Sequence, residues 1–422
     1  MLFKNISILD EDLDYKENMF VATDEGKITY VGDVAPENYE GETYDGTGKL
    51  LMSGFYNIHS HSPMSLLRGY GENMMLSDWL NKRIFPFEAK MNASDNYNGS
   101  LLSIAEMIRG GVVSNSDMYY QTPALIRAAK ESGFKTNLSV PVLCFDNSSL
   151  RDLPVFDEMT NMDADGILVK CEYSIHAEYT STPKVVRELA EQAKADKRSI
   201  HVHLSETKSE HEECIARHGM TPTAYFESLG VFDVPTTAAH CVWADENDIE
   251  IMGRKGVTVA CNPTSNMKLA SGFANVKLML EKGINVGLGT DGSASNNTLD
   301  MISELKMFAL IYKGITGDPT VVTPKQALAA ATINGAAAQG RNGGLVKVGS
   351  DADLIVLDTT RENYTPAYEM INNIVYSSNS RDVVLTMING KVVYKNGEFM
   401  TIDIEKAKFE AKKSVERIIG EL

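Results

Sequence analysis

Several features that would indicate other classes of protein are scarce or absent in this sequence. Only five cysteines occur in 422 residues, none in a CxxC spacing: Cys144, Cys171, Cys214, Cys241 and Cys261. An odd, scattered set of this kind argues against a disulfide framework and a cysteine-based zinc site, and it suits the reducing cytoplasm. No run approaches the ~18 apolar residues of a membrane span. The N-terminus turns acidic within its first residues, unlike a signal peptide.

Positive charge is also scarce. Lysine and arginine number 40 against 57 acidic residues, which makes the net charge -17. A nucleic-acid backbone would be repelled by such a surface, so we expect no DNA or RNA partner. A small nucleoside stays compatible, because the charge within a site matters more than the total. The hydrophobic fraction of 43% and the charged fraction of 23% are typical of a soluble globular protein.

The middle of the chain alternates strand-like and helix-like stretches. From about residue 53, apolar runs are followed by helical patterns. For example, GVVSNSDMY (111–119) is followed by PALIRAAKESG (123–133), a helical pattern that ends at Gly133. About eight such units follow Phe55, which predicts parallel strands joined by helices in a (β/α)8 TIM-type barrel over 53–344. A doubly wound open sheet is the alternative, but no GxGxxG motif follows a first strand to support it.

Both ends of the chain show β-strand patterns. Residues 1–52 contain short strand-like runs separated by turn sequences. Residues 345–422 contain two Asn-Gly turns, at 389–390 and 396–397, between alternating apolar runs, a strong hairpin signal. They close with an amphipathic helical stretch. We therefore predict an α/β protein in which both chain ends pair into one small β-sandwich domain beside the barrel.

Four of the eight histidines lie at the ends of strand-like runs. His59 and His61 share one face of a strand, because successive side chains alternate. His203, His240 and Asp291 also follow apolar runs, and catalytic groups of such barrels cluster at the carboxyl ends of strands. Singly, each has a structural explanation as a packed histidine or a helix cap. Together, imidazoles and a carboxylate in this order predict an open site for one divalent ion, zinc or else iron.

The strand SIHVHLSE (199–206) carries further candidates. His201 lies on the same face as His203 and could serve in its place, but His203 is nearer the carboxyl end. Glu206 follows three residues later, where a carboxylate could act as general acid and base. Its structural alternative is a negative charge at a helix N-terminus.

Longer motifs carry a resemblance to a known family. The segments FYNIHSH, HLSET, AAHCVW, NPTSNMKLASG and GLGTDGSASNNTLDM, in this order, resemble the amidohydrolase superfamily. The branch that the chain resembles most holds 5-methylthioadenosine/S-adenosylhomocysteine deaminases and related chlorohydrolases, and the likeness runs nearly end to end. It implies that His59, His61, His203 and Asp291 bind the metal. It also implies that His240 hydrogen-bonds the water at that metal, and that Glu206 shuttles the proton.

The same resemblance implies a set of substrate contacts. Trp79 and Glu88 match positions that contact the ribose hydroxyls, and His176 matches one that hydrogen-bonds a purine ring nitrogen. Each also has a structural alternative as a core aromatic, a surface charge or a strand-end histidine. Arg151 matches one of two arginines that hold the amino-acid carboxylate of S-adenosylhomocysteine, and Ser139 stands in place of the other. The grip on that carboxylate is then reduced.

Two-metal relatives place a modified lysine at the end of the fourth barrel strand. Here Lys170 lies in the middle of that strand and His176 at its end, which favours one metal.

We therefore expect a cytoplasmic, metal-dependent deaminase that converts an adenine nucleoside to the inosine-type product and ammonia. The candidate substrates are methylthioadenosine, S-adenosylhomocysteine, adenosine and 5'-deoxyadenosine. One alternative is related hydrolysis of a guanine, pterin or triazine ring. A second, a non-catalytic metal-binding scaffold, conflicts with the presence of Glu206 and Asp291. The expected partner is a small molecule, with no nucleic acid or membrane, and a homo-oligomer is left open.

Overall fold

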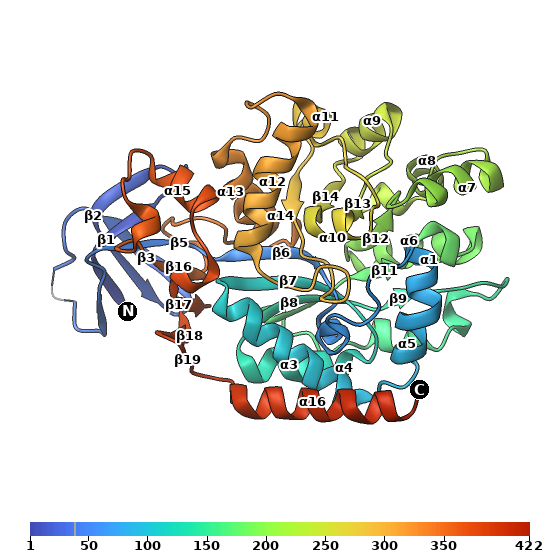
Figure 1. Ribbon diagram of the computed structural model, residues 1–422, viewed down its shortest axis with the longest axis horizontal. Helices are drawn as coiled ribbons and strands as arrows, with labels where there is room; N and C mark the ends of the chain where they lie inside the picture. Colours follow the sequence, from blue (N-terminus) through green and yellow to red (C-terminus); the bar gives the residue numbers. More distant parts are fainter. Residues whose placement is uncertain (38) are drawn as a thin grey trace.

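Parallel strands in the middle of the chain form a barrel (Figure 1). The structure is a computed structural model that describes residues 1–37 and 39–422. Two sheets, in the orders β10-β8-β7-β6 and β15-β14-β13-β12-β11-β9, curve into one ring. The amide of Asp291 closes it by donating to the carbonyl of His59 at 2.9 Å. The strands are β6 (Phe55–Ser60), β7 (Val112–Met118), β8 (Lys135–Ser139), β9 (Pro141–Val142), β10 (Val169–Cys171), β11 (Tyr173–Ile175), β12 (Ile200–Leu204), β13 (Thr236–His240), β14 (Thr258–Cys261) and β15 (Val286–Leu288).

Two positions of the ring are interrupted strands. One position is formed by β8 and then β9, and the neighbouring position by β10 and then β11. Across the two positions β8 pairs with β10 and β9 pairs with β11, both in parallel. The ring therefore has the eight strand positions that the sequence predicts, and the α/β barrel class is confirmed.

Helices cover the outside of the barrel (Figure 1). Local sequence sets their ends: the Thr182 side chain caps α6 by accepting from the amide of Val185, and Gly133 ends α4 in the left-handed conformation. The longer barrel helices are α3 (Ala93–Arg109), α4 (Thr122–Ser132), α6 (Pro183–Asp196), α7 (Lys208–His218), α8 (Pro222–Ser228), α9 (Glu246–Lys255), α12 (Met301–Thr316) and α13 (Pro324–Ala331). The shorter ones are α1 (Leu76–Trp79), α2 (Phe85–Glu88), α5 (Val155–Thr160), α10 (Pro263–Lys268), α11 (Val276–Glu281) and α14 (Ile333–Ala338).

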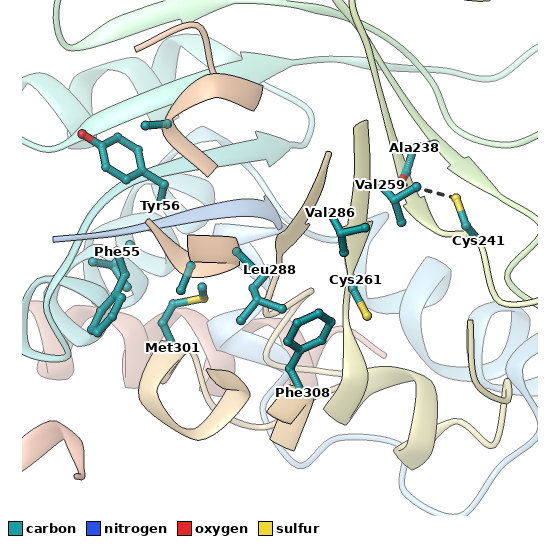
Figure 2. Close-up of a cluster of buried hydrophobic side chains, with 14 of the residues drawn as sticks. Phe55, Tyr56, Ala238, Cys241, Val259, Cys261, Val286, Leu288, Met301 and Phe308 are labelled. Carbon is teal, nitrogen blue, oxygen red and sulfur yellow. Dashed lines mark hydrogen bonds between the residues drawn. The ribbon is translucent and has the colours of Figure 1, made fainter. Parts of the chain in front are cut away.

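Figure 2 shows how one of these helices is held against the barrel. Leu288 at the end of β15 lies near Met301 and Phe308 of α12, and all three side chains are buried in one apolar cluster. Burying a large apolar side chain stabilises a fold by about 1.5–3 kcal/mol. This packing anchors both ends of the loop that carries Asp291.

The two ends of the chain form a single mixed sheet of nine strands. The path is β19-β18-β17-β16-β5-β1-β2-β3, with β4 paired to β1. A bridge between Lys27 and Asp351 brings β3 back toward β16, so the sheet folds over its own apolar core. The strands are β1 (Leu2–Leu9), β2 (Tyr15–Asp24), β3 (Lys27–Gly32), β4 (Thr43–Asp45), β5 (Lys49–Ser53), β16 (Leu354–Asp358), β17 (Val383–Ile388), β18 (Lys391–Lys395) and β19 (Glu398–Phe399).

The predicted hairpins and the terminal helix are present. Asn389 and Asn396 have φ of 49°, and each precedes a glycine with positive φ, as tight hairpin turns require. Helix α16 (Ile404–Gly420) crosses the barrel beside α3 in Figure 1, where Asn98 donates to Ser414. A further helix, α15 (Met370–Tyr376), lies between β16 and β17 in sequence. Division of the chain at residues 52 and 344 stays a prediction.

Within the described residues, no helix is both long and apolar enough to cross a membrane.

Candidate metal centre and active-site cavity

Five predicted side chains meet at the carboxyl ends of the barrel strands. His59 lies near the end of β6 and His61 directly follows that strand. His203 lies on β12, His240 ends β13, and Asp291 follows β15. Nε2 of His61 lies 3.2 Å from Oδ1 of Asp291, and Nε2 of His59 lies 3.5 Å from it. One candidate ion-binding group contains His59, His61 and Asp291, and a second contains His59, His203 and His240, with ligand atoms within 4.8 Å in each. The spacing suits a shared cation.

The outer nitrogens of these rings are held by other partners. Nδ1 lies 2.7 Å from the Met118 carbonyl in His61 and 2.7 Å from the His176 carbonyl in His203. Such contacts aim the Nε2 lone pairs at the centre of the cluster, as they do in metal sites.

The Nε2 atom of His59 is buried and has no hydrogen-bond partner among the described residues. An unsatisfied buried nitrogen among imidazoles and a carboxylate matches the donor set of a divalent cation such as zinc. The residues present therefore fit a divalent ion.

Asp291 is oriented by two hydroxyl groups. Ser265 and Ser295 donate to its Oδ2 at 2.6 and 2.8 Å, which leaves Oδ1 facing His59 and His61. The φ of Asp291 is 61°, in the left-handed region that costs a residue of this kind free energy. Such strain is typical of functional sites, where packing around the residue maintains it.

His240 differs from the other histidines in its surroundings. Its Nδ1 lies 2.8 Å from Oδ1 of Asn266, and its Nε2 lies 3.8 Å from Oε2 of Glu206. His240 also has a φ of 72°. Its ring therefore lies between the cluster and the carboxylate of Glu206, where it could touch an ion or a water beside it.

Glu206 is a buried carboxylate at the edge of the cavity. Its side chain accepts from Ser271 at 3.2 Å, and 9% of the residue is exposed. Burial raises its pKa above the usual glutamate value, and the charge of Asp291 adds to this, although His240 opposes it. A raised pKa favours the protonated form, so Glu206 can donate a proton as well as accept one.

A cavity opens from the cluster and brings in most of the predicted substrate residues. Trp79, Glu88 and His176 line it together with Glu206 and Asp291. Burial lowers the pKa of His176 to about 4, so this ring is neutral at pH 7 and can hydrogen-bond without carrying charge.

Arg151 is not brought to this cavity. It is exposed on a short 3-10 turn at Leu150–Asp152 and is not among the described residues that line the inner cavity or the outer one next to it. Ser139, in the position of the second arginine, is buried in β8.

Tyr119 is a cavity residue that sequence reasoning missed. Its hydroxyl donates to Oε1 of Glu88 at 2.6 Å, and it also lines the cavity. Its position directly after β7 was the available signal, because residues that follow barrel strands lie at the functional end.

Lys170 points away from the cluster. Its Nζ donates to the carbonyl of Gly340 at 2.5 Å. An ammonium bound there cannot contribute a ligand at the strand ends.

Fold and site together define a (β/α)8-barrel protein with a polar cluster for a divalent ion at the carboxyl ends of its strands. Residues 50–393 match the amidohydrolase family. The chain belongs to this family.

Individual relatives match over nearly their whole length. The chain is 39% identical to 5-methylthioadenosine/S-adenosylhomocysteine deaminase of Thermoanaerobacter pseudethanolicus, covering 99% of both chains. It is also 39% identical to 5'-deoxyadenosine deaminase of Methanosarcina acetivorans, over 100% of this chain and 98% of the relative. An adenosine deaminase from Xanthomonas campestris, solved with bound zinc, has a TM-score of 0.91 at 28% identity, covering 99% of this chain and 98% of that one.

Proposed function

We propose that this protein catalyses the hydrolytic deamination of an adenine nucleoside. Water replaces the 6-amino group of the ring, and the products are an inosine-type nucleoside and ammonia. The observation that carries the proposal is one cavity in which Glu206 lies beside the cluster of His59, His61, His203 and Asp291. The relatives named above as deaminases of adenine nucleosides support the same reaction.

His59, His61, His203 and Asp291 hold one divalent ion in this proposal. We infer zinc, because imidazole and carboxylate are zinc ligands and the Xanthomonas relative was solved with zinc. When bound, such an ion supplies one kind of chemistry: it lowers the pKa of a water to about 7 and so provides a nucleophile at neutral pH. The distant position of Lys170 supports a single ion.

The chain's own groups then move the protons. Asp291 accepts a proton from the attacking water, and His240, beside Glu206, hydrogen-bonds the attacking oxygen and polarises it. Glu206 delivers a proton to N1 of the ring, which its raised pKa allows. The proton that Asp291 took from the water then goes to the departing amine, and Glu206 assists the departure of ammonia by regaining a proton from the C6 hydroxyl as the carbonyl forms.

The opposite wall of the cavity binds the rest of the nucleoside. The Glu88 carboxylate accepts from the two ribose hydroxyls, and Trp79 packs beside the sugar; both residues line the cavity. His176, held at Nδ1 by contact with Thr180 at 3.1 Å, hydrogen-bonds a purine ring nitrogen.

The 5' substituent of the preferred substrate carries no carboxylate. A carboxylate would need cationic partners, and Arg151 lies outside the described lining of both cavities. The outer cavity is lined by apolar groups such as Phe145 and Trp243, by Glu212 and Glu213, and by one cation, Lys208, which is already paired with Glu212 at 3.4 Å. We therefore rank methylthioadenosine, 5'-deoxyadenosine and adenosine above S-adenosylhomocysteine.

A cytoplasmic location suits the five free cysteines.

The decisive experiment measures ammonia release from the zinc-loaded protein. The panel contains adenosine, methylthioadenosine, 5'-deoxyadenosine and S-adenosylhomocysteine, with guanine, a pterin and a chlorotriazine as comparison substrates. We expect the nucleosides to exceed the free ring compounds in kcat/KM. Release of ammonia or chloride from the comparison substrates alone would contradict the proposal.

Glu206→Gln tests the proton carrier. The amide cannot donate and accept a proton in turn, so we expect kcat to fall about 100- to 10,000-fold. The zinc content, measured by atomic emission, should stay near one ion per chain. Near-native turnover by this variant would show that Glu206 does not carry the proton.

A further inference from the structure

Backbone carbonyls orient two of the three proposed metal-binding histidines. Met118 and His176 provide these carbonyls to Nδ1 of His61 and His203, respectively. A carbonyl only accepts hydrogen bonds, so each Nδ1 must carry a proton. Each Nε2 is then left with a lone pair for the ion.

The Nδ1 atom of His59 faces a different kind of partner from a backbone carbonyl. Its Nδ1 lies 2.9 Å from Nε2 of a second imidazole, that of His201. A neutral imidazole nitrogen is either a donor or an acceptor, so this contact alone leaves the direction of the hydrogen bond undetermined. If His201 donated, the proton of His59 would lie on Nε2 and block the ion.

The contact at Nδ1 of His201 determines the direction of the hydrogen bond between His201 and His59. Its Nδ1 lies 3.8 Å from Oε2 of Glu172, and His201 and Glu172 are 1% and 4% exposed. An ionised carboxylate offers only acceptors, so it favours a proton on Nδ1 of His201. Although burial raises the pKa of Glu172, the interactions with His201 and Asn137 outweigh it and keep the pKa below the usual glutamate value.

Glu172 is itself held in one orientation from the far side. Asn137 donates to its Oε1 at 2.7 Å through Nδ2. The amide of Asn137 cannot flip, because its Oδ1 accepts from Nη2 of Arg341 at 2.9 Å and a guanidinium has only donors.

We propose that Arg341, Asn137, Glu172 and His201 form a one-way chain of polar contacts that keeps the proton of His59 on Nδ1 and its Nε2 lone pair on the metal. His201 and Glu172 are therefore positioning residues, which act on the ion through His59. This inference rests on the metal site of the proposed function and extends it through the interior of the barrel.

Glu172→Gln tests the direction of this chain. Asn137 donates to residue 172, so the carbonyl oxygen of glutamine must face Asn137 and its amino group must face His201. The polar contact of residue 172 with His201 and the hydrogen bond between His201 and His59 then both reverse, and the proton of His59 moves to Nε2. His201→Leu instead removes the partner of His59. Ser174→Ala is the matched control, because Ser174 is a buried residue of β11 whose hydroxyl has no described partner.

The first measurement is zinc affinity, obtained by competition between each full-length protein and a chromogenic chelator. We expect Glu172→Gln and His201→Leu to weaken binding about 10- to 100-fold. Ser174→Ala should stay within about threefold of the parent, as expected for a buried residue outside the chain of contacts. Thermal unfolding of each variant shows whether it is folded. If His201→Leu does not fold, the isosteric Glu172→Gln still tests the inference.

The second measurement is independent of turnover. Nitrogen-15 NMR of the histidine side chains in the zinc-stripped full chain reports which ring nitrogen of His59 carries the proton. We expect Nδ1–H in the parent and Nε2–H in Glu172→Gln.

The possible outcomes separate this inference from the metal site itself. If the parent binds no divalent ion, the metal site of the proposed function fails. If the parent binds zinc and Glu172→Gln matches it in both affinity and tautomer, the inference is overturned and the metal site stands.

Discussion

At the scale of single residues, the carboxylates of the cavity determine what this site can do. Glu206 and Glu88 both lie in the cavity, and burial raises the pKa of each. Their partners differ. Glu206 lies near the His240 ring and Ser271, whereas Glu88 accepts from the Tyr119 hydroxyl at 2.6 Å. Glu206 thus lies beside the cluster of histidines, and in our proposal Glu88 binds the substrate elsewhere in the cavity.

We expect Glu88→Gln to weaken the use of nucleosides. The carboxylate accepts two hydrogen bonds from the ribose diol in our proposal, whereas an amide offers one acceptor. Losing one hydrogen bond to a charged group costs about 1.5–3 kcal/mol, so kcat/KM should fall about 10- to 100-fold. Steady-state kinetics with the preferred nucleoside measure this.

The matched substrate is 2',3'-dideoxyadenosine, which has no diol. The parent and Glu88→Gln should use it with similar kcat/KM. An equal loss on both substrates would mean that Glu88 supports the cavity wall instead of binding the sugar.

At the scale of elements, α12 holds the loop that carries Asp291. Glu304 in its first turn is fully buried and accepts from Nδ2 of Asn296 at 2.7 Å and from the amide of Thr264 at 3.2 Å. Asn296 in turn donates to the carbonyl of Thr290. One carboxyl group therefore ties α12 to α10, which follows β14, and to the loop after β15.

Glu304 should make stability depend on pH. Burial raises its pKa from 4.5 to about 7. Between these values the folded protein keeps a proton that the unfolded chain has released, so stability falls as pH rises through this window. We expect the parent to lose about 2 kcal/mol relative to Glu304→Gln between pH 5 and 7.

Urea unfolding of both proteins at pH 5, 6 and 7 measures this difference. Both proteins contain the same other titrating groups, including Glu210, so the contributions of those groups to the pH dependence of stability cancel in the comparison. A constant difference in unfolding free energy across the three pH values would rule out titration of Glu304 in this range.

At the scale of the whole molecule, a buried ion pair joins the barrel to the sheet of the chain ends. Lys135 of β8 lies 2.6 Å from Oδ2 of Asp353 and 2.9 Å from Oδ2 of Asp351, both just before β16. The side chains of Lys135 and Asp353 are 1% and 0% exposed. Tyr56 of β6 also donates to Asp353, at 2.9 Å.

We expect Lys135→Met to destabilise the whole fold by about 3–5 kcal/mol, because it leaves the Asp353 carboxylate buried without its counter-charge. Lys27→Met is the control: Lys27 also pairs with Asp351, but its side chain is 47% exposed. Its loss should cost no more than about 1 kcal/mol. Chemical unfolding of the three proteins measures both values, and equal costs would show that burial does not govern the pair.

Patterns over a few residues made much of this structure predictable. Alternation along a strand places His59 and His61 on one face, and the Asn-Gly pairs at 389–390 and 396–397 form the expected tight turns. Gly133 ends its helix where the sequence indicates. These features depend on local backbone preferences, which act in the same way wherever the segment lies.

Contacts between segments far apart in the chain were harder to predict from the sequence. His201 and His203 lie on the same face of β12 and could not be separated securely by pattern. In the folded chain, His201 meets Nδ1 of His59 and faces Glu172, whereas His203 is held by the carbonyl of His176. The exclusion of Arg151 from the cavity and the inclusion of Tyr119 also depend on how loops close over the barrel.

The sequence by itself determined the strand and helix order, the barrel and the residue types gathered at its carboxyl ends, because periodicity and turn chemistry are local. Only the tertiary structure decided which nitrogen faces the centre of the cluster and which carboxylates are buried. Those depend on distances between segments as far apart as β6, β12 and the loop after β15, and such distances exist only once the ring has closed.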